Sequence, residues 1–203
     1  MRKTILMPLV ALLVAAIVLL AAYNISIPAR QARIQEELTA KMQTILPGST
    51  TFTQEEYTGE DANIRAVYKG ETGYVVNTVT YGYAGNITML IGVSNEGKVT
   101  GLQVRDMQET YGLGAQALTD WEFLAQFLNT TGNVAISTEG VDAFASATQK
   151  TEGAPAEEVS VDGLTGATVT SKAIAKSVNS AVGFVTGADV VTEATKWGES
   201  YEE

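Results

Sequence analysis

The sequence predicts an α+β domain, a twisted antiparallel sheet with packed helices, that follows a single transmembrane helix at the amino terminus. Three observations support this fold class: an uncharged apolar run over Ile5–Tyr23, alternating β-type residues over Tyr74–Arg105, and an amphipathic helical pattern over Ser171–Val185. We expect three parts along the chain, a transmembrane anchor, a juxtamembrane amphipathic helix and a folded domain, at residues 1–28, 29–48 and 49–203.

The composition limits what the chain can bind. Of its 203 residues, 45% are hydrophobic and 18% are charged, which suits one ordinary domain with an additional segment. The chain holds 13 Lys and Arg against 23 Asp and Glu, a formal net charge of −10. This excess of negative charge repels phosphate backbones, so neither DNA nor RNA is expected as a partner.

Two residue types that carry much of enzyme chemistry are missing, because the sequence contains no cysteine and no histidine. The chain alone therefore cannot build a thiolate nucleophile, a disulfide, an iron–sulfur cluster, a His-ligated haem or a Cys/His zinc site. A Ser–His–Asp relay is excluded for the same reason. We expect no catalytic residues and no metal site, so any redox work must use a cofactor that needs neither residue.

The apolar run Ile5–Tyr23 has the length of a membrane span. Its 19 residues carry no charge, and as a helix they reach about 28 Å, close to the thickness of a hydrocarbon core. A cleaved secretory signal is the alternative, since Arg2 and Lys3 form a basic leader. The run exceeds the roughly 7–15 apolar residues of a signal, so an anchor retained in the lipid bilayer is favoured. Basic residues flank both sides, so the positive-inside rule does not set the orientation.

A helix is expected directly after the anchor. Pro28 restarts the chain, and Ala29–Leu46 shows apolar residues at spacings of four, four and three. Pro47 and Gly48 end this helix. Its apolar face consists of Ile34, Leu38, Met42 and Ile45.

The strand signal begins after this helix. Tyr74–Tyr83 is rich in Val, Thr and Tyr, and apolar residues alternate along the next stretch, Ile87–Val93. Asn95–Gly97 forms a turn, and Val99–Arg105 returns as a further strand. The pattern predicts antiparallel neighbours.

Two more helices and a short strand are expected in the second half. Thr119–Glu122 fits a capping box that opens a helix running to about Leu128. Residues 129–160 are predicted to form loops around a short strand at Val134–Ile136. The last helix, Ser171–Val185, has one apolar face made of Ile174, Val178, Ala181, Val182 and Val185. The two tryptophans, Trp121 and Trp197, are interpreted as packing residues.

The segment most suited to chemistry is Asp162–Ser171, which reads DGLTGATVTS and stands at the start of the last helix. It combines a tight glycine turn with hydroxyl side chains and the first helical turn. Unpaired backbone N–H groups and the positive end of the helix dipole favour an anion there. Lys172 adds a positive charge, and Thr168 offers an alcohol that can be esterified to a phosphate. The alternative is structural, since Thr and Ser in this place commonly act only as helix caps.

This segment resembles the flavinylation motif, Asp-Gly-x-Thr-Gly-Ala-Thr, of the FMN-binding domain family found in membrane redox pumps. The family includes the G subunit of the Rnf complex and the C subunit of the sodium-translocating NADH:quinone reductase. In that family a flavin transferase joins FMN, through its phosphate, to the last threonine of the motif, which is Thr168 here. The resemblance covers roughly residues 1–186 and implies FMN held covalently by a phosphoester.

A second motif supports the resemblance. Glu109–Gly114 reads ETYGLG, whereas relatives commonly show His-x-Glu-Thr-Pro-Gly-Leu-Gly. Met107 stands where that histidine would be, and Tyr111 replaces the proline. Tyr111 is therefore a candidate for stacking on the flavin ring. An ordinary glycine-rich connection is the alternative interpretation of this loop.

The resemblance implies that both motifs surround the cofactor, with Thr168 as the attachment point. The other candidate cofactor-binding residues are Asp162, Gly163, Leu164, Thr165, Gly166, Ala167, Val169, Thr170, Ser171, Lys172, Glu109, Thr110, Tyr111, Leu113 and Gly114.

The function implied by the resemblance is electron relay through FMN, within an ion-translocating ferredoxin:NAD⁺ oxidoreductase of the Rnf type that moves Na⁺ or H⁺. The short chain favours the Rnf protein over its longer quinone-reductase counterpart, which remains an alternative. Expected partners are the other components of the Rnf complex and a flavin transferase. The expected location is the bacterial inner membrane, with the domain on the extracytoplasmic side. A non-redox membrane-tethered scaffold with an unmodified Thr168 is the rival from a different class.

Overall fold

The computed structural model of the protein describes residues 2–132, 134–137 and 159–187. The chain divides into two compact units, Met1–Lys41 and Met42–Glu203. The first unit consists of most of one helix, and the second contains all the strands and the other helices that the structure describes.

Helix α1 runs without interruption over Arg2–Ile45. The expected restart at Pro28 is wrong, because the helix continues through that residue. A proline inside a helix removes one backbone hydrogen bond, and the turns on either side can still form. The predicted end of the following segment is confirmed, since α1 ends immediately before Leu46. Within the described part of the chain, no helix combines the length and the apolar character required to span a bilayer.

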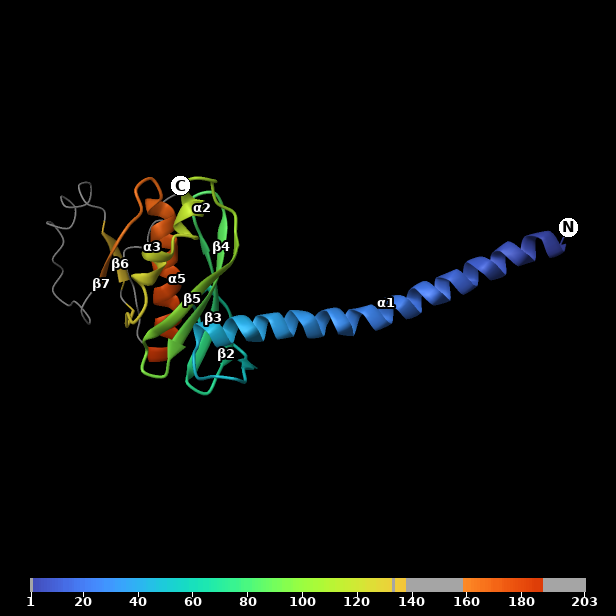
Figure 1. Ribbon diagram of the computed structural model, residues 1–203, viewed down its shortest axis with the longest axis horizontal. Coiled ribbons are helices and arrows are strands. Elements are labelled where there is room, and N and C mark those ends of the chain that lie inside the picture. The colour runs from blue at the N-terminus through green and yellow to red at the C-terminus, as the bar shows by residue number, and fades with distance from the viewer. Residues whose placement is uncertain (1, 133, 138–158, 188–203) are drawn as a thin grey trace. The chain divides into compact units, whose positions relative to one another are not determined.

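The main sheet has five strands in the order β1-β2-β3-β4-β5, and all neighbours are antiparallel (Figure 1). The predicted strands between Tyr74 and Arg105 are confirmed as β3, β4 and β5. Sequence analysis missed β1 and β2. The strands are β1 Thr53–Glu55, β2 Ile64–Lys69, β3 Gly73–Tyr81, β4 Asn86–Ser94 and β5 Val99–Met107.

The predicted turn between β4 and β5 is present. Gly97 has φ +81°, a left-handed conformation that glycine adopts without steric cost. The Ser94 N–H donates to the Lys98 carbonyl oxygen at 2.8 Å and closes the hairpin. Next to the turn Val93 faces Val99, and a register shift between Gly92 and Val93 then places Ile91 opposite Leu102.

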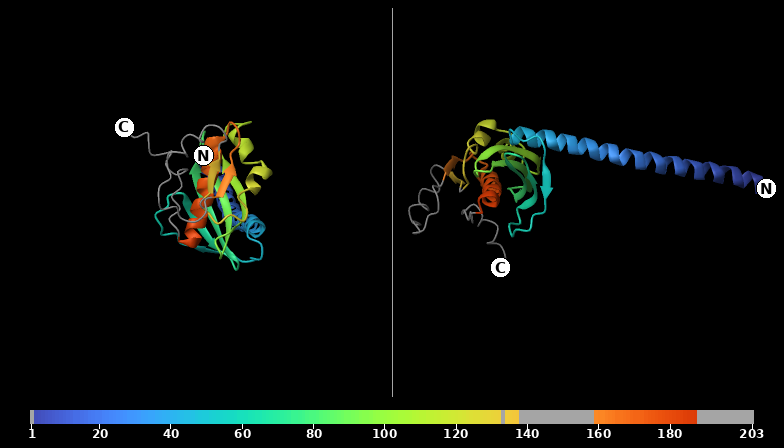
Figure 2. Two further views of the ribbon diagram at one scale, coloured as in Figure 1. Left: turned by 90° about the vertical axis from the view of Figure 1, so that its left-hand side faces the viewer. Right: turned by 90° about the horizontal axis from the view of Figure 1, so that it is seen from below.

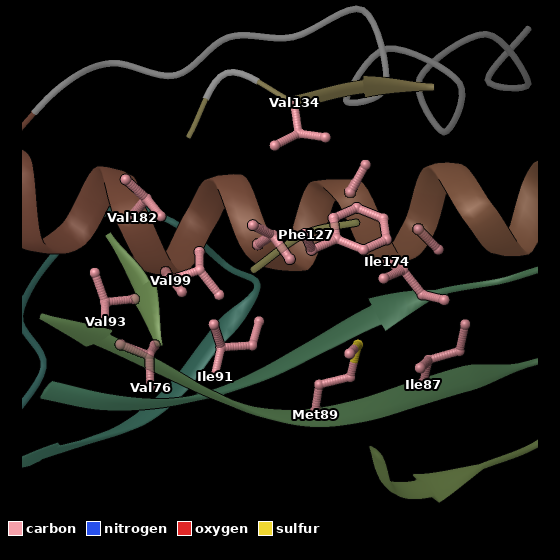
Figure 3. Close-up of a cluster of buried hydrophobic side chains, with 14 of the residues drawn as sticks. Val76, Ile87, Met89, Ile91, Val93, Val99, Phe127, Val134, Ile174 and Val182 are labelled. Atoms are coloured by element: carbon pink, nitrogen blue, oxygen red, sulfur yellow. The ribbon is translucent and has the colours of Figure 1, made fainter. Parts of the chain in front are cut away.

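Helix α5, Thr168–Thr186, crosses one face of this sheet and forms the centre of the core (Figure 3). It begins three residues before the predicted Ser171. The expected apolar face is confirmed, because four of its members are buried and Val185 is partly buried. Ile174 and Val182 lie over the inward-facing residues of the sheet, which include Val76, Met89, Ile91 and Val93.

A second, two-stranded sheet packs on α5. It pairs β6 Val134–Ser137 with β7 Val159–Asp162 in parallel. Figure 3 shows Val134 on the side of α5 that faces away from the five-stranded sheet. The strand predicted at Val134–Ile136 is therefore confirmed, and β7 was missed. Helix α5 is thus covered on two sides, as the turned views also show (Figure 2).

The buried side chain of Asn179 fastens β6 to α5. Its Oδ1 accepts from the Val134 N–H at 2.9 Å, and its Nδ2 donates to the Val134 carbonyl oxygen at 3.0 Å. An asparagine amide has one donor edge and one acceptor edge, so it reproduces the pairing of a neighbouring strand. A helix residue therefore supplies the partner that the backbone of Val134 needs.

Two short helices, α2 Gly114–Ala117 and α3 Trp121–Ala125, connect β5 to β6. The predicted capping box at Thr119 is wrong by one residue, because Asp120 caps α3 and accepts from the N–H groups of Glu122 and Phe123. The Thr119 hydroxyl instead donates to the carbonyl oxygen of Gln116. Helix α3 also ends at Ala125, and turns continue to Asn129.

The packing role assigned to Trp121 is wrong, since its side chain is 73% exposed. The apolar residue that α3 buries is Phe123, which stacks edge-on against Phe127. The other tryptophan, Trp197, lies outside the described residues, as does most of the predicted 129–160 loop region.

On the sheet face opposite α5, two neighbouring glycines leave room for the main chain of another segment. Gly92 on β4 faces Gly101 on β5. A Cβ on Gly101 would lie 2.7 Å from the Ile45 Cα, and one on Gly92 would overlap the Ile45 carbonyl oxygen. That oxygen accepts from the Thr100 hydroxyl at 2.7 Å. Glycine is required here because the main chain at Ile45 lies directly on the sheet.

We predict that Asn179→Leu destabilises the domain by about 2–3 kcal/mol, because it leaves the buried N–H and carbonyl of Val134 without partners. Urea unfolding of the full chain measures this. Asn86→Leu is the matched control, since Asn86 is exposed on β4 and its replacement should change the unfolding free energy by less than about 0.5 kcal/mol. Equal effects of the two variants would contradict the role given to Asn179.

The exposed carboxylate of Glu71 ties the segment after α1 to the β2–β3 turn. It accepts from the N–H of Thr50 at 3.0 Å and from the hydroxyl of Thr51 at 2.9 Å. The hydrogen bond from the Glu71 backbone N–H, followed by that from the Thr51 hydroxyl, lowers the pKa of Glu71 to about 2. These bonds stabilise the ionised form.

We predict that Glu71 contributes stability that is fully present above pH 4.5 and is lost as the pH falls towards about 2, because its pKa is lower in the folded than in the unfolded chain. Urea midpoints of the wild type and of Glu71→Gln measure the effect. Their difference should be constant above pH 4.5 and should shrink below it. A difference that does not change with pH would exclude titration of this carboxylate.

Candidate functional site

The turn between β7 and α5 contains the segment that the sequence singles out. The Gly163 N–H donates to the Ser137 carbonyl oxygen, and the Ala167 N–H donates to that of Leu164, each at 2.9 Å. Gly166 has φ +79°, so glycine is required at that position. The turn is therefore tied to β6 at one end and closes tightly before the helix begins.

The first turn of α5 leaves its backbone N–H groups available. Ala167 is the N-cap residue, and within the described residues no side chain caps it. The Ser171 N–H is the first to bond a helix carbonyl, that of Ala167. The N–H groups of residues 168–170 precede it and are those a helix start leaves unpaired.

The structural alternative, in which the Thr and Ser residues only cap the helix, does not match these contacts. Ser171 Oγ donates to the Ala167 carbonyl oxygen at 3.0 Å and accepts from the Leu164 N–H at 3.3 Å. It closes the preceding turn and leaves the helix N–H groups unused. The site can therefore accept an anion through those N–H groups and the helix dipole.

The residues of this segment differ in their access to solvent. Thr165, Gly166 and Val169 are exposed, and Thr168 is half-buried at the first position of the helix. Lys172 is half-buried one turn later. Asp162 has an exposed side chain, while its N–H donates to Gln126 Oε1 at 3.0 Å. The Thr168 hydroxyl thus stands at an accessible helix start beside one cationic residue.

The second motif lies in the loop after β5 and in the start of α2. The carboxylate of Glu109 accepts from the N–H of Tyr83 at 2.8 Å and from that of Ala84 at 3.4 Å. Both residues belong to the turn between β3 and β4. Thr110, in contrast, is exposed, and its carbonyl oxygen accepts from the N–H groups of Leu113 and Ala115.

The fold brings the two motifs into contact. A Cβ on Gly166 would lie 3.4 Å from Leu113 Cδ2. A Cβ on Gly114 would lie 2.6 Å from both Thr170 Oγ1 and Glu109 Oε2. Segments more than 50 residues apart in sequence therefore meet at the start of α5, and Figure 1 shows α2 at that end of the helix.

One buried polar atom stands where the motifs meet. Thr170 Oγ1 is fully buried and has no hydrogen-bond partner among the described residues. An unpaired buried hydroxyl costs free energy, so such atoms commonly mark a place where another group belongs. Within the described residues, no cluster of acidic side chains is suited to hold a metal ion.

Three large side chains on the loops that lead to this point are exposed. Tyr111 is 97% exposed and Leu113 is 50% exposed. Tyr83, which sequence analysis did not select, is 70% exposed and lies in the turn that Glu109 holds. In the sequence Tyr83 stands between Gly82 and Gly85, which indicates a turn. Nothing in that pattern indicates a contact with residue 109.

Met107, which replaces the histidine of the related motif, is partly buried against the core. It also lines a hollow of about 460 Å³ between β5 and the α2–α3 segment, together with Leu118 and Leu124. None of the residues from 162 to 172 lines that hollow. This hollow is therefore separate from the segment that carries Thr168.

The comparisons with known proteins agree with the two motifs. Residues 82–183 match the model of the FMN-binding domain family. The G subunit of the proton-translocating ferredoxin:NAD(+) oxidoreductase complex of Clostridium ljungdahlii is 35% identical over 113 residues, which are 56% of this chain and 53% of that protein. The G subunit of the ion-translocating oxidoreductase complex of Methanosarcina acetivorans is 32% identical over 168 residues, or 76% of this chain and 77% of that protein.

The match to the clostridial relative spans about half of that protein's length. Among solved structures, the C subunit of the Na(+)-translocating NADH-quinone reductase of Parabacteroides distasonis has a TM-score of 0.51 at 19% identity, covering 77% of this chain and 94% of that chain. This likeness shows that the α+β fold is shared. The family model covers residues 82–183, which include both motifs and the contact between them. The resemblance carried by the two motifs is confirmed, and the chain belongs to the FMN-binding domain family.

Proposed function

We propose that this chain is the membrane-anchored flavoprotein component of an ion-translocating ferredoxin:NAD⁺ oxidoreductase of the Rnf type, with FMN joined by a phosphoester to Thr168. The observation that carries the proposal is the uncapped start of α5, which has the Thr168 hydroxyl at its first position. The family membership supports FMN as the cofactor. The names of the relatives, which are G subunits of oxidoreductase complexes, support the assembly.

The residues present fit a flavin phosphate. An ester to the Thr168 Oγ1 leaves about one negative charge at the helix start, where the dipole and the N–H groups of residues 168–170 stabilise it. Lys172 lies one turn away and adds a full positive charge. The orphaned Thr170 hydroxyl gives a further hydrogen-bonding group on the same turn.

The FMN, when bound, supplies the electron transfer, and this chain determines its position and surroundings. The ester keeps the flavin from leaving the site. The contact between Leu113 and Gly166 brings the second motif against the attachment turn, where Val169 is also exposed. Tyr111 stands two residues before Leu113 and is proposed to reach the flavin ring from this loop. Leu113 and Gly114 allow close approach, Thr110 is proposed to lie near the flavin ring, and Glu109 holds the neighbouring turn.

The anchor is proposed from the apolar run Ile5–Tyr23. The side chains of residues 12–20 are exposed around α1, so this stretch is apolar on all sides, as a segment in lipid would be. We place the following domain on the extracytoplasmic side of a bacterial inner membrane. There it would exchange electrons with other components of the complex, after a flavin transferase has loaded it.

We predict that the chain expressed with its flavin transferase gains the mass of one FMN less one water, and that Thr168→Ala abolishes this gain because the ester has no oxygen to form on. Intact mass measurement and flavin fluorescence after denaturation are the readouts. Thr168→Ser is the matched control, since it retains the hydroxyl and should remain flavinylated.

An unmodified wild-type mass under those conditions would contradict the redox function. The chain would then be a membrane-tethered scaffold whose α5 begins without an attached group.

We predict that Tyr111→Ala raises the fluorescence of the attached flavin and shifts its midpoint potential, because a stacked phenol both quenches the ring and tunes its surroundings. Tyr111 is 97% exposed in the chain alone, so its ring is free to contact a cofactor. Tyr111→Phe keeps the ring and should shift the potential less. Unchanged fluorescence and potential in Tyr111→Ala would exclude stacking by this residue.

A further inference from the structure

We infer that Glu109 is a positioning residue that fixes the Gly82–Gly85 turn, and with it Tyr83, beside the start of α5, so that Tyr83 forms a second aromatic wall of the flavin site. This inference rests on the proposed function only for the role of Tyr83. The part played by Glu109 in holding the turn concerns the chain alone and can be tested without the cofactor.

The carboxylate of Glu109 is directed into the protein. Oε1 accepts from the Tyr83 N–H at 2.8 Å, and Oε2 lies 3.4 Å from the N of Ala84, whose N–H it also accepts. Two successive backbone N–H groups thus face one carboxylate. Bonds from N–H groups to an ionised acceptor are stronger than bonds between neutral groups, so this contact determines where the turn lies.

Two buried glycines make room for this carboxylate. A Cβ on Gly82 would overlap Oε1 of Glu109 and would also lie 2.7 Å from Ile87 Cδ1. A Cβ on Gly114 would lie 2.6 Å from Oε2. The carboxylate therefore occupies a slot between the β3–β4 turn and the start of α2, and a side chain on either glycine would displace it.

The same slot reaches the attachment helix. A Cβ on Gly114 would be 2.6 Å from Thr170 Oγ1 as well as from Glu109 Oε2. These two oxygens therefore both lie beside the Gly114 Cα. A connected set of contacts therefore runs from the Tyr83 backbone through Glu109 and Gly114 to the first turn of α5. The β3–β4 turn is thereby linked to the helical turn that carries Thr168.

Tyr83 is the residue of this turn whose side chain can stack on a flavin ring. Its N–H is held, while its ring is 70% exposed and projects from a fixed backbone. Tyr81, which is 72% exposed at the end of β3 and lies outside the turn that Glu109 holds, serves as a matched neighbour. Aromatic faces stack on planar rings, and a phenol close to a flavin quenches its fluorescence.

The first experiment uses the full chain without flavin and follows hydrogen exchange over residues 82–86 by mass spectrometry. Glu109→Ala should speed exchange of the Tyr83 and Ala84 amides by about tenfold, because it removes their shared acceptor. Glu109→Gln keeps one acceptor oxygen and should restore the protection of the Tyr83 amide but not that of Ala84. Glu96→Ala, at an exposed glutamate in the β4–β5 turn, should leave this segment unchanged. Wild-type exchange in Glu109→Ala would overturn the positioning role.

The second experiment uses the flavin-loaded chain and a double-mutant cycle. Tyr83→Ala should raise flavin fluorescence at least about twofold, Glu109→Ala should raise it by a similar factor, and the double variant should exceed neither. Tyr81→Ala should leave it unchanged. Multiplying effects in the double variant would show that Glu109 acts on the flavin directly, and no effect of Tyr83→Ala would exclude the second aromatic wall.

The two inferences can fail separately. A wild-type chain that never acquires flavin contradicts the proposed function, while the exchange experiment still decides whether Glu109 positions the turn. A loaded chain with unchanged exchange in Glu109→Ala contradicts the positioning role and leaves the flavin attachment standing.

Discussion

Helix α5 packs against two sheets, and the rest of the domain depends on these two contacts. Its apolar residues cover the inner face of the five-stranded sheet, and Asn179 supplies β6 with a hydrogen-bonding edge. The parallel partner of β6 leads directly into the turn that starts α5. The same helix therefore orders the core, holds the small sheet and fixes its own first turn, where the chemistry is proposed to occur.

The second motif reaches that first turn through close backbone contacts. Leu113 lies against Gly166, and Gly114 stands between Glu109 and Thr170. Each contact uses a glycine, so the two loops approach more closely than side chains would allow. Family membership accounts for both motifs being present, and these contacts show how the fold brings them together.

Much of the architecture could be predicted because its signals are local. The helical periodicity from Ile174 to Val182 follows from burial on one face and is confirmed. Strand β4 is confirmed as well, although the structure buries it on both faces from Met89 to Val93. Strand β1 reads Thr-Gln-Glu and has no buried residue to create such a pattern, and β7 is only four residues long. Asp120 and Thr119 are both good capping residues, so sequence alone could not decide which one begins α3.

The sequence motif around Thr168 locates the proposed attachment turn. It does not show which other residues surround that turn. Nothing near Glu109 in the sequence indicates that its carboxylate bonds the backbone 26 residues earlier. Tyr83 was missed for the same reason, because its position depends on a contact between two turns. Trp121 is exposed because Phe123 is the residue of α3 that faces the core. Both residues are aromatic, so residue type alone could not predict which of them is buried.

The uncapped start of α5 has a consequence for how the chain matures. A Ser, Asp or Asn at the position of Ala167 would stabilise the helix by about 1 kcal/mol. With alanine as the N-cap residue, this stabilising hydrogen bond is not formed. A phosphate esterified at Thr168 would supply an acceptor for the N–H groups at this helix start and would raise the melting temperature of the domain. Loading with the cofactor would then complete the folding of the protein, and an unloaded copy would be the more readily unfolded and degraded form.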